Sequence, residues 1–157
     1  MSTPDPPPPP LWTTTAAAEP SAPPGERRMR LLGIHHVTAI SHDLDATTAF
    51  YRDVLGLSLV RAGTNDDDPG ARHFWFGDPQ GTPGTLMSFL EYPGMGAGTV
   101  GTGSTHHVAF SVGSAAELDA WRSYLEDRGV SCTDVLERGG LRSIYVRDPD
   151  GHIIEIV

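Results

Sequence analysis

The chain has 157 residues, of which 20 are acidic and 11 are basic, and its formal net charge at pH 7 is −9. This acidic balance argues against nucleic acid as the main partner. The single cysteine, Cys132, excludes an internal disulfide and a thiolate metal cluster. All of the basic residues are arginine, which also excludes Schiff-base chemistry on a lysine.

The first 30 residues form a proline-rich segment that holds nine of the fourteen prolines. Such a composition cannot bury enough apolar surface to offset the entropy of ordering it, so we predict a disordered tail over residues 1–30. The tail has no apolar run long enough for a signal peptide or a membrane anchor, and we therefore expect a cytoplasmic protein with no membrane partner. Residues 31–157 are predicted to fold as one α+β domain.

Residues 31–157 contain two copies of one pattern. The stretch IHHVTAIS at 34–41 is repeated 71 positions later as THHVAFSV at 105–112. Each stretch has the alternation of a strand, and each is followed by an amphipathic helical segment and three short strand-like runs. The sequence therefore predicts two tandem βαβββ modules, over 31–92 and 105–157, joined by a glycine-rich linker over 93–104. The helices are predicted at 42–57 and 113–130, and the later strands at 57–63, 71–78, 85–92, 130–137, 141–148 and 152–157.

Strand alternation places three ligand-type side chains on one side of the predicted sheets. In HHVAFSV the valines and the phenylalanine would pack beneath the helix, which turns His107 toward a cleft between the sheets. By the repeat, His36 and Thr38 face the same cleft. Glu155 lies inside the apolar run IIEIV, a costly place for a carboxylate unless it is paired or coordinated. Two imidazoles and one carboxylate are a donor set typical of Fe(II) or Mn(II) with open coordination positions.

The repeat also predicts where a fourth ligand would stand. The counterpart of Glu155 in the first module falls near Ser88, and serine is a poor ligand for these metals. Glu91 is three positions further on and has the opposite strand parity. We therefore expect three protein ligands.

These motifs resemble those of the vicinal oxygen chelate superfamily, which includes glyoxalase I, extradiol dioxygenases, fosfomycin-resistance thiol transferases and bleomycin-resistance proteins. The segment from GIHHVTAIS through DDDPGARHFWFGDPQGTPGT is similar to the N-terminal module of dioxygenases that open hydroquinones. The stretches THHVAFSV and RSIYVRDPDGHIIEIV are similar to the last module of those enzymes. The resemblance spans residues 31–157 and implies a vicinal-oxygen-chelate domain with a central metal cleft.

The resemblance also implies roles for particular residues. The second histidine of each pair and the glutamate of the last strand match the metal ligands of the family: His36, His107 and Glu155. Five further positions match groups that orient substrate, move protons and stabilise oxyanions: Thr38, His35, His106, Arg138 and Tyr145. Strand alternation agrees for Thr38 but turns His35 and His106 away from the cleft, so a structural role stays open for these two histidines.

The function that the resemblance implies is an Fe(II)- or Mn(II)-dependent ring-cleaving dioxygenase, which acts with dioxygen on a small hydroquinone- or catechol-like aromatic. Three alternatives stay open: a metal-dependent thiol transferase of the fosfomycin-resistance type, a glyoxalase-like enzyme, and a metal-free resistance protein that binds a small molecule. The absence of lysine disfavours the thiol transferase, and Ser88 disfavours the glyoxalase-like enzyme. The complete ligand set disfavours the metal-free binding protein. Relatives that cleave rings usually have four modules rather than two, and a homodimer is one way to replace the missing surface.

Overall fold

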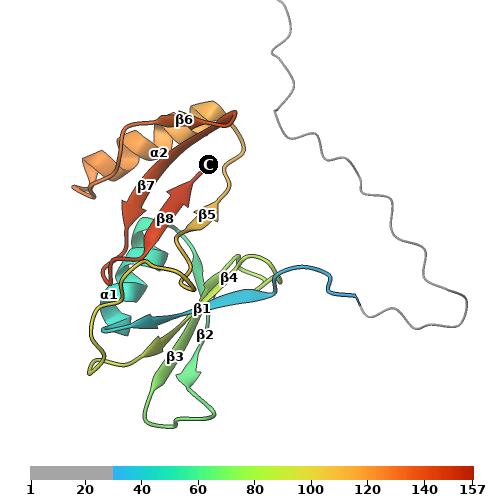
Figure 1. Ribbon diagram of the computed structural model, residues 1–157, viewed down its shortest axis with the longest axis vertical. Helices are drawn as coiled ribbons and strands as arrows, with labels where there is room; N and C mark the ends of the chain where they lie inside the picture. The colour runs from blue at the N-terminus through green and yellow to red at the C-terminus, as the bar shows by residue number, and fades with distance from the viewer. Residues whose placement is uncertain (1–29) are drawn as a thin grey trace, which may run out of the picture.

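The computed structural model describes residues 30–157, so the tail predicted over residues 1–30 lies outside the described residues except for its last position. Two four-stranded sheets, each built from one half of this range, form a mixed α+β fold (Figure 1). Each half runs strand, helix and three strands, which confirms the predicted fold of two tandem βαβββ modules.

The first sheet has the strand order β1-β4-β3-β2. Strand β1 runs parallel to β4, and the other two pairs are antiparallel. Val37 and Ala39 of β1 pack against the core, whereas His36 and Thr38 are exposed on the opposite face, as strand alternation requires. The strands of this sheet are β1 (His36–Ser41), β2 (Ser58–Thr64), β3 (Arg72–Gly77) and β4 (Leu86–Glu91).

The helical segment of the first half is divided, whereas the sequence predicts one continuous helix. Helix α1 (Leu44–Thr48) passes directly into the π-helix η1 (Ala49–Val54). The hydroxyls of Thr47 and Thr48 donate hydrogen bonds to the backbone carbonyls four residues earlier. Such back-bonding bends helices, and here it immediately precedes the change to π geometry.

The second sheet repeats this topology with the order β5-β8-β7-β6 and a parallel β5–β8 pair. Helix α2 (Ala115–Asp127) begins where the spacing of Ser114 and Glu117 predicts. The hydroxyl of Ser114 accepts a hydrogen bond from the N–H of Glu117, whose carboxylate accepts one from the N–H of Gly113. The strands of this sheet are β5 (Val108–Phe110), β6 (Leu136–Arg138), β7 (Leu141–Arg147) and β8 (Ile153–Ile156).

Both halves contribute to one hydrophobic core. Buried side chains of α1 and η1, such as Leu44 and Tyr51, belong to the same cluster as Leu118 and Leu125 of α2. Polar contacts also cross between the halves: the hydroxyl of Tyr124, for example, donates a hydrogen bond of 2.9 Å to the carbonyl of Val54. None of the helices within residues 30–157 is both long enough and apolar enough to cross a membrane.

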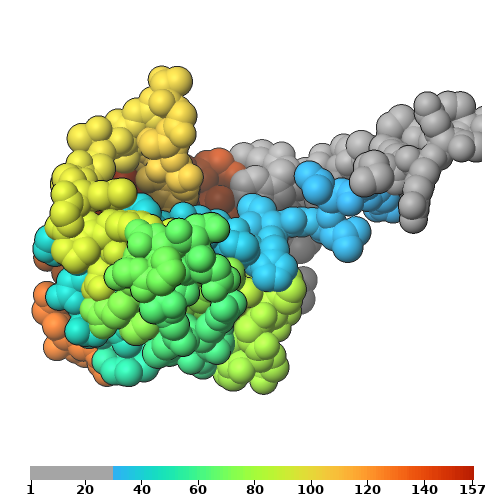
Figure 2. Space-filling model, turned by 90° about the horizontal axis from the view of Figure 1, so that it is seen from below, coloured from blue at the N-terminus to red at the C-terminus, as the bar shows by residue number. Residues whose placement is uncertain are grey.

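Two segments remain outside this packing. The linker between β4 and β5 forms a ridge (yellow in Figure 2), and residues at the start of the described range (blue) project from the body of the molecule. Leu31 and Leu32 are 98% and 96% exposed, and Ile34 is 71% exposed. The apolar residues just before β1 are therefore left uncovered in a single copy of the chain.

Candidate metal centre

His107, Glu155 and Tyr145 form a connected group on the second sheet. Glu155 lies opposite Ala109 of β5 and opposite Tyr145 of β7, so the side chains at these positions share one face. One carboxylate oxygen, Oε2, lies 3.0 Å from Nε2 of His107, and the other, Oε1, accepts a hydrogen bond of 2.7 Å from the hydroxyl of Tyr145. Glu155 is only 7% exposed. Two protein side chains therefore hold this buried carboxylate.

The spacing of the donor atoms suits a divalent cation. Imidazole nitrogen and carboxylate oxygen bind such ions at about 2.1 Å, so two donors at right angles around one ion are about 3.0 Å apart. The separation between Nε2 of His107 and Oε2 of Glu155 is 3.0 Å. A neutral imidazole with a carboxylate is also a donor combination that Fe(II) and Mn(II) accept. His107 and Glu155 therefore fit two neighbouring positions around such a metal.

The two histidine pairs share one internal geometry. Nδ1 of His35 lies 3.0 Å from Nδ1 of His36, and Nδ1 of His106 lies 2.9 Å from Nδ1 of His107. The two rings of each pair are nearly perpendicular, at 88° and 86°. A single hydrogen on either Nδ1 atom can join each pair, and when the second histidine carries it, Nε2 of that ring has a lone pair that can bind a metal. Strand alternation alone did not predict this contact, since it turned the first histidine of each pair away.

His36 lies on the outward face of the first sheet. Thr38 and Ser88 face each other across the β1–β4 pair, and their hydroxyls are hydrogen-bonded at 2.8 Å. The indole of Trp75 lies beside the ring of His36, with ring centroids 4.6 Å apart. Ser88 is the residue between Thr38 and Trp75 in the register of the sheet, and its small side chain leaves room for the indole to reach across β4.

A single copy of the chain brings together two of the three predicted ligands. Within residues 30–157, only Asp148, Asp150 and His152 form a group of three His, Cys, Asp or Glu side chains whose ligand atoms all lie within 4.8 Å of one another. His36 therefore does not join His107 and Glu155 in such a group. Its assignment as the third ligand stays a prediction.

A cavity of about 660 Å³ lies between β1 and the start of β5. Thr38 lines it from the first sheet, His106 and His107 line it from the second, and residues of the linker form a further wall. Small-molecule sites in proteins commonly have volumes of this order, and an aromatic ring fits within it.

Arg138 has no polar contact with the Glu155 group. It is the last residue of β6, it pairs with Leu141 of β7, and its side chain is exposed. Within the part of the chain that the structure describes, its side chain forms no hydrogen bond or ion pair. The role implied for Arg138 by the family resemblance stays a prediction.

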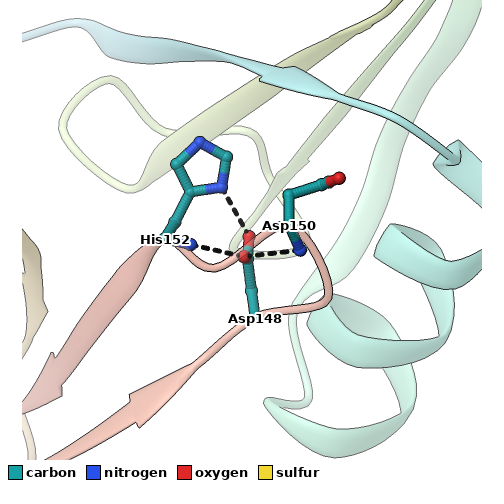
Figure 3. A group of neighbouring side chains, drawn as sticks. All are labelled: Asp148, Asp150 and His152. Carbon is teal, nitrogen blue, oxygen red and sulfur yellow. Dashed lines mark hydrogen bonds and ion pairs between the residues drawn. The ribbon is translucent and has the colours of Figure 1, made fainter. Parts of the chain in front are cut away.

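The group formed by Asp148, Asp150 and His152 is a hydrogen-bonded turn (Figure 3). Oδ1 of Asp148 accepts hydrogen bonds from the backbone N–H groups of Asp150 and His152. Oδ2 accepts one from the hydroxyl of Tyr51 and lies 2.9 Å from Nδ1 of His152. Because these contacts already satisfy both oxygens, and the carboxylate of Asp150 points away from them in Figure 3, the cluster is a structural link rather than a metal site.

The carboxylate of Asp148 shifts the acidity of its two side-chain partners in a direction that favours the hydrogen bonds. The hydrogen bond to Asp148 raises the pKa of His152, against the opposing effect of burial. Burial, together with the charge of Asp148, raises the pKa of Tyr51 far above its usual range, so its hydroxyl remains a donor at all ordinary pH values.

The motifs did not identify His73 and Trp75 as candidate site residues. Strand alternation alone could have placed both side chains on the same face as His36. In the run RHFWFG, Phe74 and Phe76 join the core, so His73 and Trp75 stand on the other face with His36. Their rings lie 5.1 Å apart. Nε2 of His73 and Nε1 of Trp75 are buried and have no hydrogen-bond partner among residues 30–157. Burial and the nearby charge of Arg61 lower the pKa of His73, which keeps its ring neutral near pH 7.

The fold and these residues define the class of protein. Residues 33–156 match the family model described as "Glyoxalase/Bleomycin resistance protein/Dioxygenase superfamily", and the chain belongs to this superfamily. This finding confirms the predicted resemblance.

Curated relatives fall into two groups. MhqE of Bacillus subtilis, which carries the name of a ring-cleaving dioxygenase, is 48% identical over 103 residues, which are 66% of this chain and 34% of MhqE. The chlorohydroquinone/hydroquinone 1,2-dioxygenase of Sphingobium indicum is 30% identical over 77% of this chain and 38% of its own length. The metallothiol transferase FosB of Shouchella clausii is 29% identical over 79% of this chain and 78% of its own. The chain thus spans little more than a third of the length of MhqE and of the Sphingobium indicum dioxygenase.

The chain also matches part of a solved structure. The crystal structure of a Bacillus subtilis protein named as a dioxygenase superposes with a TM-score of 0.75 and 39% sequence identity. The match covers 80% of this chain and 40% of that protein.

Proposed function

We propose that this chain carries the metal site of a ring-cleaving dioxygenase acting on a hydroquinone- or catechol-like aromatic, with Fe(II) or Mn(II) as the metal. The observation that carries the proposal is the contact of 3.0 Å between His107 and Glu155, with Tyr145 bonded to the second carboxylate oxygen at 2.7 Å. The dioxygenase names of MhqE and of the Sphingobium indicum relative support the reaction class.

The metal would be held by His36, His107 and Glu155, three ligands that leave positions open for substrate and dioxygen. When bound, the metal supplies a Lewis-acidic, redox-active centre at which an aromatic hydroxyl and dioxygen meet. Tyr145 fixes the orientation of Glu155 by donating to Oε1. This contact commits the Tyr145 hydroxyl as a donor, which makes it a positioning residue rather than the base for the substrate proton.

The tautomers of His106 and His107 follow from their contact. His107 can bind a metal through Nε2 only when its hydrogen sits on Nδ1, where it is donated to Nδ1 of His106. A neutral His106 then carries its own hydrogen on Nε2, and His106 lines the cavity. We therefore assign His106, and His35 by the repeat, to hydrogen bonding with substrate oxygens as negative charge develops on them. Thr38 and Arg138 are assigned to substrate orientation.

Because His36 does not group with His107 and Glu155 among the described residues of one copy, we assign the third ligand to a homodimer. His36 lies in β1 and His107 directly precedes β5, and both are edge strands of the sheets formed by residues 30–157. Edge strands offer free backbone groups for pairing with another chain. The exposed Leu31, Leu32 and Ile34 next to His36 provide apolar surface for the same contact. In this arrangement His36 of one copy meets His107 and Glu155 of the other.

A metal-dependent thiol transfer is the second candidate, because the match to FosB covers most of both chains. The same three ligands would serve this reaction. The complete absence of lysine from the chain weighs against a phosphonate substrate. A glyoxalase-like reaction has less support, since Ser88 stands where a second carboxylate would be needed.

The test is metal content and oxygen uptake on anaerobically purified full-length protein. Wild type is compared with His107→Ala and with His42→Ala, a histidine at an exposed position outside the ligand set. We expect about one Fe or Mn per chain in wild type and His42→Ala, loss of the metal in His107→Ala, and oxygen consumption when hydroquinone or catechol is added. Metal binding with no oxygen uptake would favour thiol transfer, and a failure to bind metal after reconstitution would refute both reactions.

A further inference from the structure

A second cavity, of about 350 Å³, lies beside the Glu155 group on the second sheet. Tyr145 and Arg147 of β7 lie opposite Glu155 and Ile153 of β8, whereas Val146 between them is buried in the core. Because side chains alternate along a strand, Tyr145 and Arg147 share the face that carries Glu155. Both line this cavity, which therefore borders the proposed metal centre through Tyr145.

The segment beside the end of β7 supplies two hydroxyl groups to the cavity. Cys132 forms an isolated bridge with Val146 and packs against the core. Its neighbours Ser131 and Thr133 therefore face the other way, into the cavity that they line. Oγ1 of Thr133 accepts a hydrogen bond of 3.1 Å from the backbone N–H of Tyr145, so its own hydrogen remains available as a donor. The other lining residues, apart from Tyr145 and Arg147, are apolar: Val130, Cys132, Val146 and Ile153.

Arg147 is the charged residue among the described residues that line this cavity. Its Nη1 donates a hydrogen bond of 2.7 Å to the carbonyl of Gly151, and it forms no ion pair within residues 30–157. Arg142 of the same strand differs, because it contacts Asp119 of α2 at 3.2 Å on the other face of the sheet. A guanidinium presents a planar fork of N–H groups that matches a carboxylate. The remaining N–H groups of Arg147 are therefore available to an anion in the cavity.

We propose that Arg147, with the hydroxyls of Ser131 and Thr133, forms a subsite for a carboxylate substituent on the aromatic substrate. The inference rests on the proposed function, because it takes the substrate hydroxyl to bind at the metal beside Glu155 while the substituent extends past Tyr145. The metal and Arg147 are then two positive centres on one face of the sheet, and they favour a substrate that carries negative charge at both places. The formal net charge of −9 disfavours such an acid everywhere else on the chain.

The experiment measures ligand affinity by titration calorimetry on the full-length protein, kept anaerobic and supplied with Mn(II). The probes are 2,5- and 3,4-dihydroxyphenylacetate, which place a carboxylate on a hydroquinone and on a catechol. Each acid is compared with its methyl ester, which keeps the ring and both hydroxyls and removes the charge. The variants are Arg147→Gln, which removes the charge and keeps a donor for Gly151, and Arg147→Lys, which keeps the charge and removes the planar fork. The matched control is Arg142→Gln, on the same strand and the opposite face.

We expect wild type to bind at least one acid about fivefold more tightly than its ester, which is the upper end of what an ion pair at an exposed arginine provides. The ratio should fall toward one in Arg147→Gln, persist in part in Arg147→Lys and stay unchanged in Arg142→Gln. It should also fall as the salt concentration rises, because salt screens an exposed ion pair. Equal affinities of acid and ester in wild type for both rings would overturn the proposal. A preference that survives in Arg147→Gln, or that is lost equally in Arg142→Gln, would overturn it as well.

The same samples separate this inference from the proposed function. Metal content and the affinity for the esters should be normal in Arg147→Gln, since Arg147 is not a ligand and the esters carry no charge. A wild type that binds no metal but prefers the acids through Arg147 would refute the metal site and support the subsite. A wild type that binds metal and consumes oxygen with the esters, but shows no preference for either acid, would refute the subsite and leave the proposed function standing.

Discussion

Tyr51 and Asp148, 97 positions apart in the sequence, are joined by a hydrogen bond of 3.0 Å between the phenol hydroxyl and the buried carboxylate. This contact ties the helical segment of the first half to the β7–β8 turn of the second. Tyr51→Phe removes one of the donors to Asp148 and leaves the ring in the core, so the free energy of unfolding should fall by about 1–3 kcal/mol.

Chemical denaturation measures this difference. The matched control is Tyr92→Phe, whose hydroxyl accepts a longer, partly buried hydrogen bond of 3.4 Å from the side-chain amide of Asn65. This control should change the free energy of unfolding by no more than about 0.5 kcal/mol. An equal effect of the two substitutions would show that the Tyr51–Asp148 hydrogen bond contributes no more to the free energy of unfolding than the Tyr92–Asn65 hydrogen bond.

The pairing of His152 with Asp148 makes stability depend on pH. Asp148 raises the pKa of His152 in the folded protein, so the protonated ring stabilises the fold. This contribution is complete below the unfolded pKa of histidine, about 6.5, and is lost as the pH rises through the higher folded value. The melting temperature of wild type should therefore fall relative to that of His152→Asn over this range. Parallel pH profiles for the two proteins would contradict the linkage.

Tyr145 should control metal affinity through Glu155 without contacting the metal. Tyr145→Phe removes the hydrogen bond of 2.7 Å that orients the carboxylate. Partners of metal ligands typically contribute about 10–100-fold in affinity, and a loss of this size is expected in competition with a chelator. Tyr124→Phe, which removes a hydroxyl bonded to the carbonyl of Val54, is the control and should bind metal like wild type. Equal affinities in all three proteins would leave Tyr145 with a structural role only.

A homodimer with shared sites predicts complementation between inactive variants. His36→Ala and His107→Ala should each bind metal poorly when pure. After unfolding and refolding as an equal mixture, half of the dimers contain both variants, and each of these has one intact site, so about one site in four should recover. Recovery in the mixture requires that His36 and His107 come from different copies. No recovery, together with a monomeric mass by sedimentation, would refute the shared site.

Strand periodicity was sufficient to predict which side chains of the second sheet face the same way. The alternation in HHVAFSV and IIEIV puts His107 and Glu155 on one face, and the structure has them in contact. The contacts within each histidine pair were not predictable in this way, because they depend on side-chain rotamers at the start of the strand. The break at residue 49 between α1 and η1 was missed for a similar reason, since hydroxyl back-bonding is invisible to a hydrophobic pattern.

The place of His36 relative to the other two ligands could not be read from periodicity. Alternation fixes the face of β1 on which His36 lies, and the structure agrees with that face. Whether this face meets His107 depends on how the two sheets are placed, which long-range packing decides. The hydrogen bond between Tyr51 and Asp148 was also not predictable from periodicity. The sequence identifies DPDG only as a turn and does not indicate that Asp148 binds Tyr51.

The division of the chain into two consecutive sheets has a consequence for the order of folding. Every strand of the first sheet comes from residues 36–91, so a nascent chain can complete this sheet before the second half has been synthesised. The parallel pairing of β1 with β4 joins partners 50 positions apart, and contacts of such long sequence separation generally form slowly. Until α2 and the second sheet arrive, the core face that includes Tyr51 stays partly uncovered, and apolar surface exposed in this way favours aggregation.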